Sequence, residues 1–97
     1  MATFIVLGKF TDQGIRSIKE SPKRPEAFKA LAAMSGVKVK ELFWTLGHYD
    51  IVTVTEAPDV ATATALGLAV ASLGNVKTET LTAFSAEEFG KIIAKMP

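Results

Sequence analysis

Two neighbouring segments with apolar side chains on both faces place the strongest constraint on how this chain can fold. Residues 37–46 and 49–56 have the character of strands, and Gly47 and His48 between them fit a two-residue type II′ turn, which requires glycine first. Pairing across this turn fixes the register and sorts the side chains. One face receives Val37, Val39, Phe43, Val52 and Val54, and the other receives Leu42, Trp44, Leu46, Tyr49 and Ile51. A sheet that contains this hairpin therefore needs cover on both sides.

The segments around the hairpin predict a ferredoxin-like α+β fold. Residues 3–9 and 75–84 have the composition of strands, and residues 26–35 and 59–73 have that of helices. A Ser-x-x-Glu capping box opens a last helix within residues 85–95. The order β-α-β-β-α-β with an extra C-terminal helix is the split βαβ arrangement. Its right-handed crossovers place both main helices on one face of a four-stranded antiparallel sheet.

The second face of this sheet is left without helices. We expect it to be the face of Leu42, Trp44 and Ile51, and an apolar patch of that size is at or beyond what monomers usually expose. A second copy stacked sheet face to sheet face would bury about 1,600 Å² in total, which is a standard interface. The sequence therefore predicts a homodimer, or a larger assembly built from dimers, with the architecture of a dimeric α+β barrel.

Composition narrows the remaining possibilities. The 97 residues suit a single domain over residues 1–97, and 11 basic against 10 acidic residues leave a formal charge of +1. Such a balance gives no electrostatic footprint for nucleic acid or an anionic membrane, so neither is an expected partner. The lack of cysteine excludes disulfides, thiolate metal sites and cysteine nucleophiles. No apolar run approaches the roughly 20 residues of a bilayer span and no signal peptide is evident, so we expect a cytoplasmic protein.

Five short segments, taken in order along the chain, carry a family resemblance. They are residues 11–15, 21–24, 44–50, 56–59 and 74–80. Together they resemble the GYD domain family, whose Gly-x-Tyr-Asp stretch falls at Gly47, Tyr49 and Asp50. The resemblance covers nearly the whole chain and implies a dimeric α+β barrel. It transfers no catalytic residues, because proteins of related fold include oxygenases with and without haem, small isomerases and amino-acid-sensing domains.

The hairpin tip holds the only histidine and the weak candidates for catalysis. His48 could act as a general base at a barrel mouth, with Tyr49 and Asp50 positioning an oxyanion or a phenol. Each also has a structural explanation, as an exposed turn residue, a sheet anchor and a partner for turn amides respectively. His48 and Asp50 supply two metal ligands where a closed site needs three or four, so we expect no metal and no other cofactor.

The face of Trp44 gives the main functional hypothesis. Leu42, Trp44, Ile51 and Thr53 would line the inner sheet face and bind a small apolar molecule, or the protein would act through its assembly. Trp44 also suits a protein interface, where aromatic anchors concentrate. Two alternatives stay open. One is a cofactor-independent oxygenase or isomerase that uses the three hairpin residues, and the other is a sensor or stress-response module whose partner is another protein.

Overall fold

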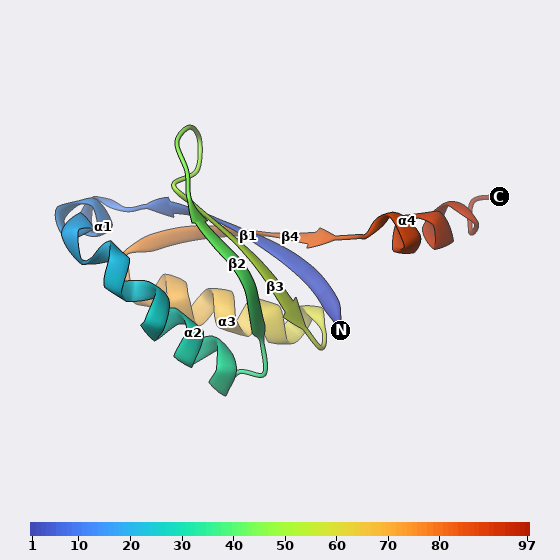
Figure 1. The fold of residues 1–97 in the computed structure, drawn as a ribbon, viewed down its shortest axis with the longest axis horizontal. Helices are drawn as coiled ribbons and strands as arrows, with labels where there is room; N and C mark the ends of the chain where they lie inside the picture. The colour runs from blue at the N-terminus through green and yellow to red at the C-terminus, as the bar shows by residue number, and fades with distance from the viewer.

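The elements follow the predicted order. A computed structural model describes the backbone of residues 1–97 and the side chains of residues 1–19 and 23–97, so part of the 21–24 segment quoted above lies outside the described side chains. The elements are β1 (Ala2–Phe10), α1 (Asp12–Arg16), the 3-10 helix η1 (Ile18–Lys23), α2 (Arg24–Met34), β2 (Lys38–Trp44), β3 (Ile51–Ala57), α3 (Val60–Ser72), β4 (Val76–Ala83) and α4 (Ala86–Ile93). The four strands form one antiparallel sheet in the order β2-β3-β1-β4 (Figure 1). The predicted four-stranded α+β fold is confirmed, and the dimeric arrangement stays a prediction.

Side-chain caps set where the later helices begin. The Asp59 carboxylate accepts from the backbone N–H of Thr62 (2.7 Å) ahead of α3, and this amide lowers the pKa of Asp59. The predicted capping box of α4 is present, because Ser85 and Glu88 exchange hydrogen bonds between side chain and backbone. In the described part of the chain, no helix combines the length and apolarity needed to cross a membrane.

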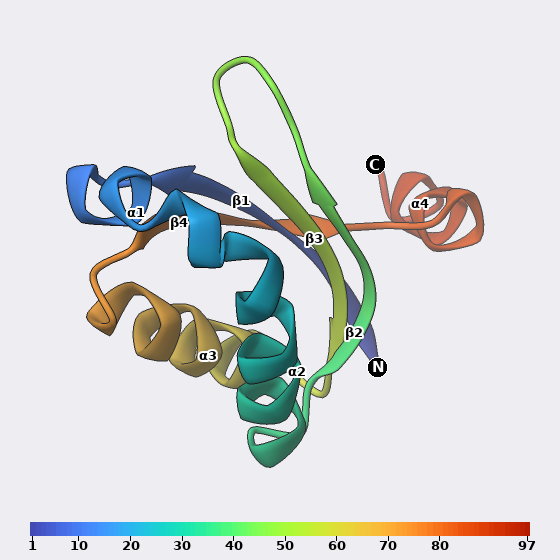
Figure 2. The ribbon, with the colours of Figure 1, turned by 60° about the vertical axis from the view of Figure 1, so that its left-hand side comes forward.

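The helices α2 and α3 cover one face of the sheet (Figure 2). Phe28 and Leu31 of α2 share its apolar side and pack against the core between the layers. Six apolar residues of the described part of the chain are buried in this core: Phe4, Ala32, Val37, Ala57, Ala63 and Leu66. Because three of these six are alanines, the core depends heavily on its largest side chain, Phe4 of β1.

The hairpin register is as predicted beside the turn and shifted farther away. Trp44 pairs with Ile51, which is the register expected from pairing across the turn. Lys40 is an extra residue in β2, and the register shifts there. Because of this bulge, Val39 lies on the face of Trp44, and its predicted place beside Phe43 is wrong. Assigning side chains to the two sheet faces by strict alternation along the strand cannot detect a bulge residue.

The face under the helices is the face of Trp44, contrary to expectation. Leu42, Trp44, Ile51 and Thr53 point toward α2 and α3, so the prediction that they form the uncovered face is wrong. The handedness of the crossovers decides which side the helices take, and a hairpin that is apolar on both faces does not reveal it. The face away from α2 and α3, called the open face below, carries Ile5, Leu7, Phe43, Val52, Val54 and Leu81.

Candidate functional site

The loop over residues 45–50 joins β2 to β3 and projects beyond the sheet (Figures 1 and 2). The N–H of Thr45 donates to the carbonyl of Asp50 (2.7 Å), and the Thr45 hydroxyl donates to the carbonyl of Tyr49 (2.6 Å). Gly47 has a φ of +114°, in the region that favours glycine. The predicted two-residue turn is therefore too short, although glycine is needed where the sequence predicts it.

Asp50 ties this loop to the end of β1. Its backbone N–H donates to the carbonyl of Gly8 (2.8 Å), and its carboxylate accepts from the N–H of Phe10 (2.9 Å). At this point β3 has not yet begun, so the carboxylate supplies an acceptor where the strand ladder offers none. These contacts fit the structural explanation of Asp50, that of a partner for backbone amides.

Tyr49 holds the same loop to β4. Its hydroxyl donates to the carboxylate of Glu79. This hydrogen bond raises the pKa of Tyr49 above its ordinary value, and loss of hydration and the negative charge of Glu79 add smaller contributions in the same direction. Together, Tyr49 and Asp50 fix the loop to the two strands that lie beyond β3 in the sheet.

The pKa of Tyr49 can be measured directly, because this is the only tyrosine in the chain. In an alkaline titration followed by tyrosinate absorbance, we expect a midpoint above about 10 for the wild type and a lower midpoint for Glu79→Gln. Because folding raises this pKa, the contribution of the bond to stability is present below the unfolded-state pKa. It is lost as pH rises through the folded-state value.

A matched variant controls for the loss of a carboxylate. Glu56 pairs with Lys40 (3.4 Å) and is not the partner of Tyr49, so Glu56→Gln is expected to leave the midpoint of the titration in place. Equal midpoints in the wild type and Glu79→Gln would show that Tyr49 and Glu79 are not in contact.

The tip of the loop is exposed to solvent. The side chain of Leu46 is 101% exposed, and His48 is exposed beside it. Tyr49 and Asp50 are engaged with β4 and β1, so the three proposed catalytic side chains do not converge on a common point. The expected acid–base role of these three residues at a barrel mouth stays a prediction. Within residues 1–19 and 23–97, no three His, Asp or Glu side chains gather as metal ligands.

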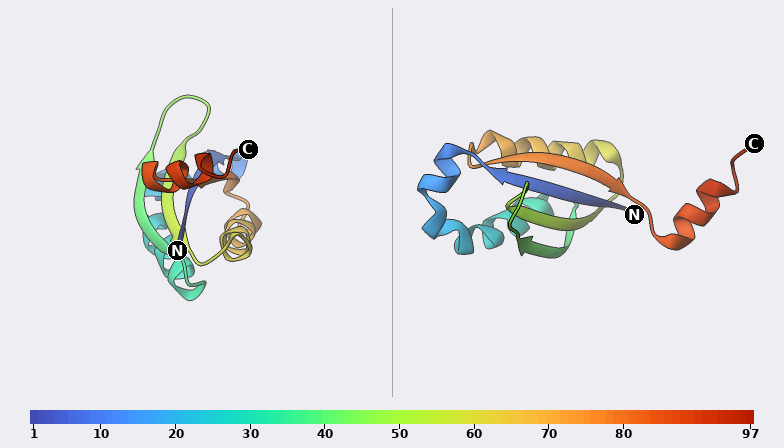
Figure 3. Two further views of the ribbon diagram at one scale, coloured as in Figure 1. Left: turned by 90° about the vertical axis from the view of Figure 1, so that its right-hand side faces the viewer. Right: turned by 90° about the horizontal axis from the view of Figure 1, so that it is seen from above.

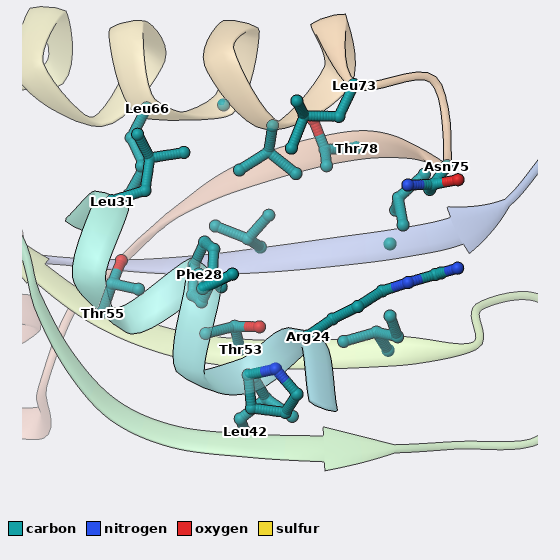
Figure 4. Close-up of a pocket in the computed structure, with 18 of the residues that line it drawn as sticks. Arg24, Phe28, Leu31, Leu42, Thr53, Thr55, Leu66, Leu73, Asn75 and Thr78 are labelled. Carbon is teal, nitrogen blue, oxygen red and sulfur yellow. The ribbon is translucent and has the colours of Figure 1, made fainter. Parts of the chain in front are cut away.

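An apolar cavity of about 190 Å³ lies between α2, α3 and the sheet (Figure 4). Leu42, Trp44, Ile51 and Thr53 all line it, so the structure brings these four predicted residues together. It does so on the side covered by the chain's own helices, where the cavity is partly open to solvent and Trp44 is 49% exposed. Their part in binding a ligand stays a prediction.

Arg24 also lines this cavity, although the sequence pattern does not single it out as a site residue. Its Nη2 donates to the carbonyl (3.0 Å) and to the hydroxyl (2.6 Å) of Ser17. Its Nη1 is buried without a hydrogen-bond partner among the described side chains. The arginine thus fastens the segment before α2 over the cavity. The only sequence signal was a basic pair at residues 23–24, which is typical of a surface.

Relatives with a stated role or structure clarify the function. A glutamine synthetase and cystathionine beta-lyase binding protein from Thermus thermophilus is 44% identical over 84 residues, which cover 86% of this chain and 88% of that protein. The crystal structure of TTHA0845, also from Thermus thermophilus, matches with a TM-score of 0.57 and 28% identity, covering 89% of this chain and 96% of that one. The first relative is named for binding two enzymes. That finding contradicts the expectation of a small-molecule binder and favours the alternative of a protein-interaction module.

The family assignment agrees with the resemblance seen in the five segments. The family model for the GYD domain matches residues 4–93, from β1 to the end of α4. The hairpin loop over residues 45–50, called the clamped hairpin below because Tyr49 and Asp50 hold it to β4 and β1, lies inside this match. The C-terminal helix α4 lies inside it as well. The chain belongs to the GYD domain family.

Proposed function

We propose that this chain is a protein-binding module whose partners are enzymes of the kind named for its relative, glutamine synthetase and cystathionine beta-lyase. The identity of 44% over 86% of the chain supports a shared binding role. The cytoplasmic location expected from the sequence is part of this proposal. The chain is thus expected to act by attaching to an enzyme surface.

The surface that carries the proposal is the tip of the clamped hairpin. Leu46 is fully exposed there, and the loop beneath it is held by Asp50 to β1 and by Tyr49 to β4. A loop that is already fixed loses little conformational entropy on binding, and side chains that bind are often carried by such loops on a rigid scaffold. Leu46 supplies an apolar contact, and the adjacent His48 supplies a polar one.

Leu46→Asp tests this assignment. Because Leu46 makes no buried contact in the chain, the variant is expected to fold normally. We expect its affinity for immobilised glutamine synthetase and cystathionine beta-lyase from the same genome to fall by about tenfold or more, since a carboxylate would replace the apolar contact. Biolayer interferometry gives the two dissociation constants.

Leu68→Asp is the matched control. Leu68 lies on α3, is 67% exposed, and receives the same change in chemistry. Its affinity for the enzymes is expected to equal that of the wild type. An equal loss in both variants would reject the hairpin as the contact surface, and a wild-type chain that binds neither enzyme would reject the function itself.

We also infer that the chain works as a homodimer joined through the open face. A folded monomer of 10.3 kDa typically exposes about 5,400 Å², and this chain exposes 6633 Å². Phe43 and Leu81 on the open face are 52% and 41% exposed. A second copy would cover about 800 Å² of each protomer in a standard interface. This proposal keeps the homodimer predicted from the sequence, but its interface is the open face instead of the face of Trp44.

A further inference from the structure

The C-terminal helix α4 stands apart from the rest of the chain. It follows β4 after a short link and extends beyond the end of the sheet (Figures 1 and 3). None of its residues is buried. The radius of gyration is 14.6 Å, where a compact domain of this length has about 12.5 Å, and the longest dimension is 51 Å. The segment over residues 84–97 is called the arm below.

The arm is a well-formed amphipathic helix that lacks a surface to pack on. Its capping box pairs the Ser85 N–H with the Glu88 carboxylate (2.9 Å) and the Glu88 N–H with the Ser85 hydroxyl (3.1 Å). A helix this short is marginal in water without tertiary contacts, even when it is capped. Its apolar side chains lie at the spacing of one helix face and are 38–70% exposed: Phe89, Ile92, Ile93 and Met96.

The arm belongs to the domain. The GYD match runs through residue 93, the last residue of α4. The chain also exposes roughly 1,200 Å² more than a compact monomer of its mass, and the arm contributes five exposed large apolar side chains to its surface: Phe84, Phe89, Ile92, Ile93 and Met96. The apolar side of α4 is exposed in every copy of the chain, so it needs a partner that stays bound. Interfaces between permanent partners are the more hydrophobic ones.

We propose that the arm of each protomer packs against a second copy of this chain, so that two copies exchange arms across the homodimer proposed above. The arm leaves its own body in an extended conformation, with Ser85 at φ −69° and ψ 168°, and this carries the helix past the end of its own sheet. A two-fold axis makes each copy both donor and acceptor of an arm, which is a low-cost way to form a dimer. An enzyme partner binds only part of the time, so it would leave the apolar stripe of the arm (Phe89, Ile92, Ile93 and Met96) exposed to solvent whenever it dissociates.

Hydrogen exchange of the arm, compared between dimer and monomer, tests this exchange. In the wild type we expect the amides of residues 89–94 to exchange at least about tenfold more slowly than in Phe43→Asp, which removes the open-face contact. The amides of β1 are expected to stay protected in both, which shows that the variant remains folded. Protection of the arm in both proteins would mean that it packs on its own chain, and protection in neither would mean that it packs on nothing. Both outcomes overturn the exchange.

A second pair of variants separates the arm from the open face. Ile92→Asp with Ile93→Asp places charge on the apolar stripe, and we expect it to raise the dimer dissociation constant about tenfold or more. The matched control, Glu87→Gln with Lys91→Gln, changes the polar side of the same helix and is expected to leave that constant unchanged. If the stripe variant dimerises like the wild type while Phe43→Asp does not, the open-face dimer stands and the arm exchange is rejected. A monomeric wild type would reject the dimer proposal itself.

Discussion

Phe43→Asp is expected to convert the protein from a dimer into a monomer of about 10 kDa. Phe43 lies on the open face and is 52% exposed in the isolated chain, so its replacement removes little from the fold itself. In a dimer joined through that face, the aspartate would replace an apolar contact with a charge that loses its hydration on association, and burying a charge costs several kcal/mol unless it is fully compensated. A loss of about 4 kcal/mol corresponds to a thousandfold weaker dimer. Light scattering coupled to size exclusion reports the mass.

Leu68→Asp serves as the control for this experiment as well. It introduces the same charge at a site on α3 that is 67% exposed and lies on the other side of the molecule from the open face. It is expected to elute at the dimer mass. A dimeric Phe43→Asp, or dissociation of both variants to the same degree, would show that the open face is not the interface.

Phe4→Ala is expected to lower the free energy of unfolding by about 3–5 kcal/mol, the usual cost of removing a buried phenylalanine ring. Phe4 is 1% exposed and is the largest side chain of a core whose other members include three alanines. Whole domains are stable by only about 5–15 kcal/mol, so the variant loses a large share of its stability. Urea denaturation followed by the fluorescence of the single tryptophan gives the change.

The comparison for this variant is Leu68→Ala, which truncates an exposed side chain. Exposed substitutions usually change stability by less than about 0.5 kcal/mol, and we expect no more here. The two variants are best compared at one protein concentration, since dimer formation adds to apparent stability. A cost below about 1 kcal/mol for Phe4→Ala would mean that Phe4 does not fill the core.

Local signals in the sequence predict the elements well and the faces of the sheet poorly. The capping box of Ser85 and Glu88 and the pairing of Trp44 with Ile51 follow from residues close together in the chain, and both are present. The bulge at Lys40 and the side taken by the helices depend on the whole sheet. A hairpin with two apolar faces fits either orientation, so the reversal of the Trp44 face could not be foreseen.

The candidate site shows the same limit. The sequence predicts that Gly47, Tyr49 and Asp50 matter together, and it offers a structural explanation for each of the two polar residues. Their partners are distant in sequence: Asp50 binds the amide of Phe10, 40 residues away, and Tyr49 binds Glu79, 30 residues away. Neither pairing leaves a local pattern, because it is the strand order β2-β3-β1-β4 that brings the partners to the hairpin.

Native mass spectrometry of the purified chain mixed with glutamine synthetase or cystathionine beta-lyase tests the binding function most directly. We expect new peaks at the mass of the enzyme assembly plus this chain, and the proposed homodimer predicts that the chain is added in pairs. We expect these peaks to weaken with Leu46→Asp and to persist with Leu68→Asp. Spectra that hold only the separate masses of chain and enzyme, for both enzymes at micromolar concentration, would contradict a role in binding them.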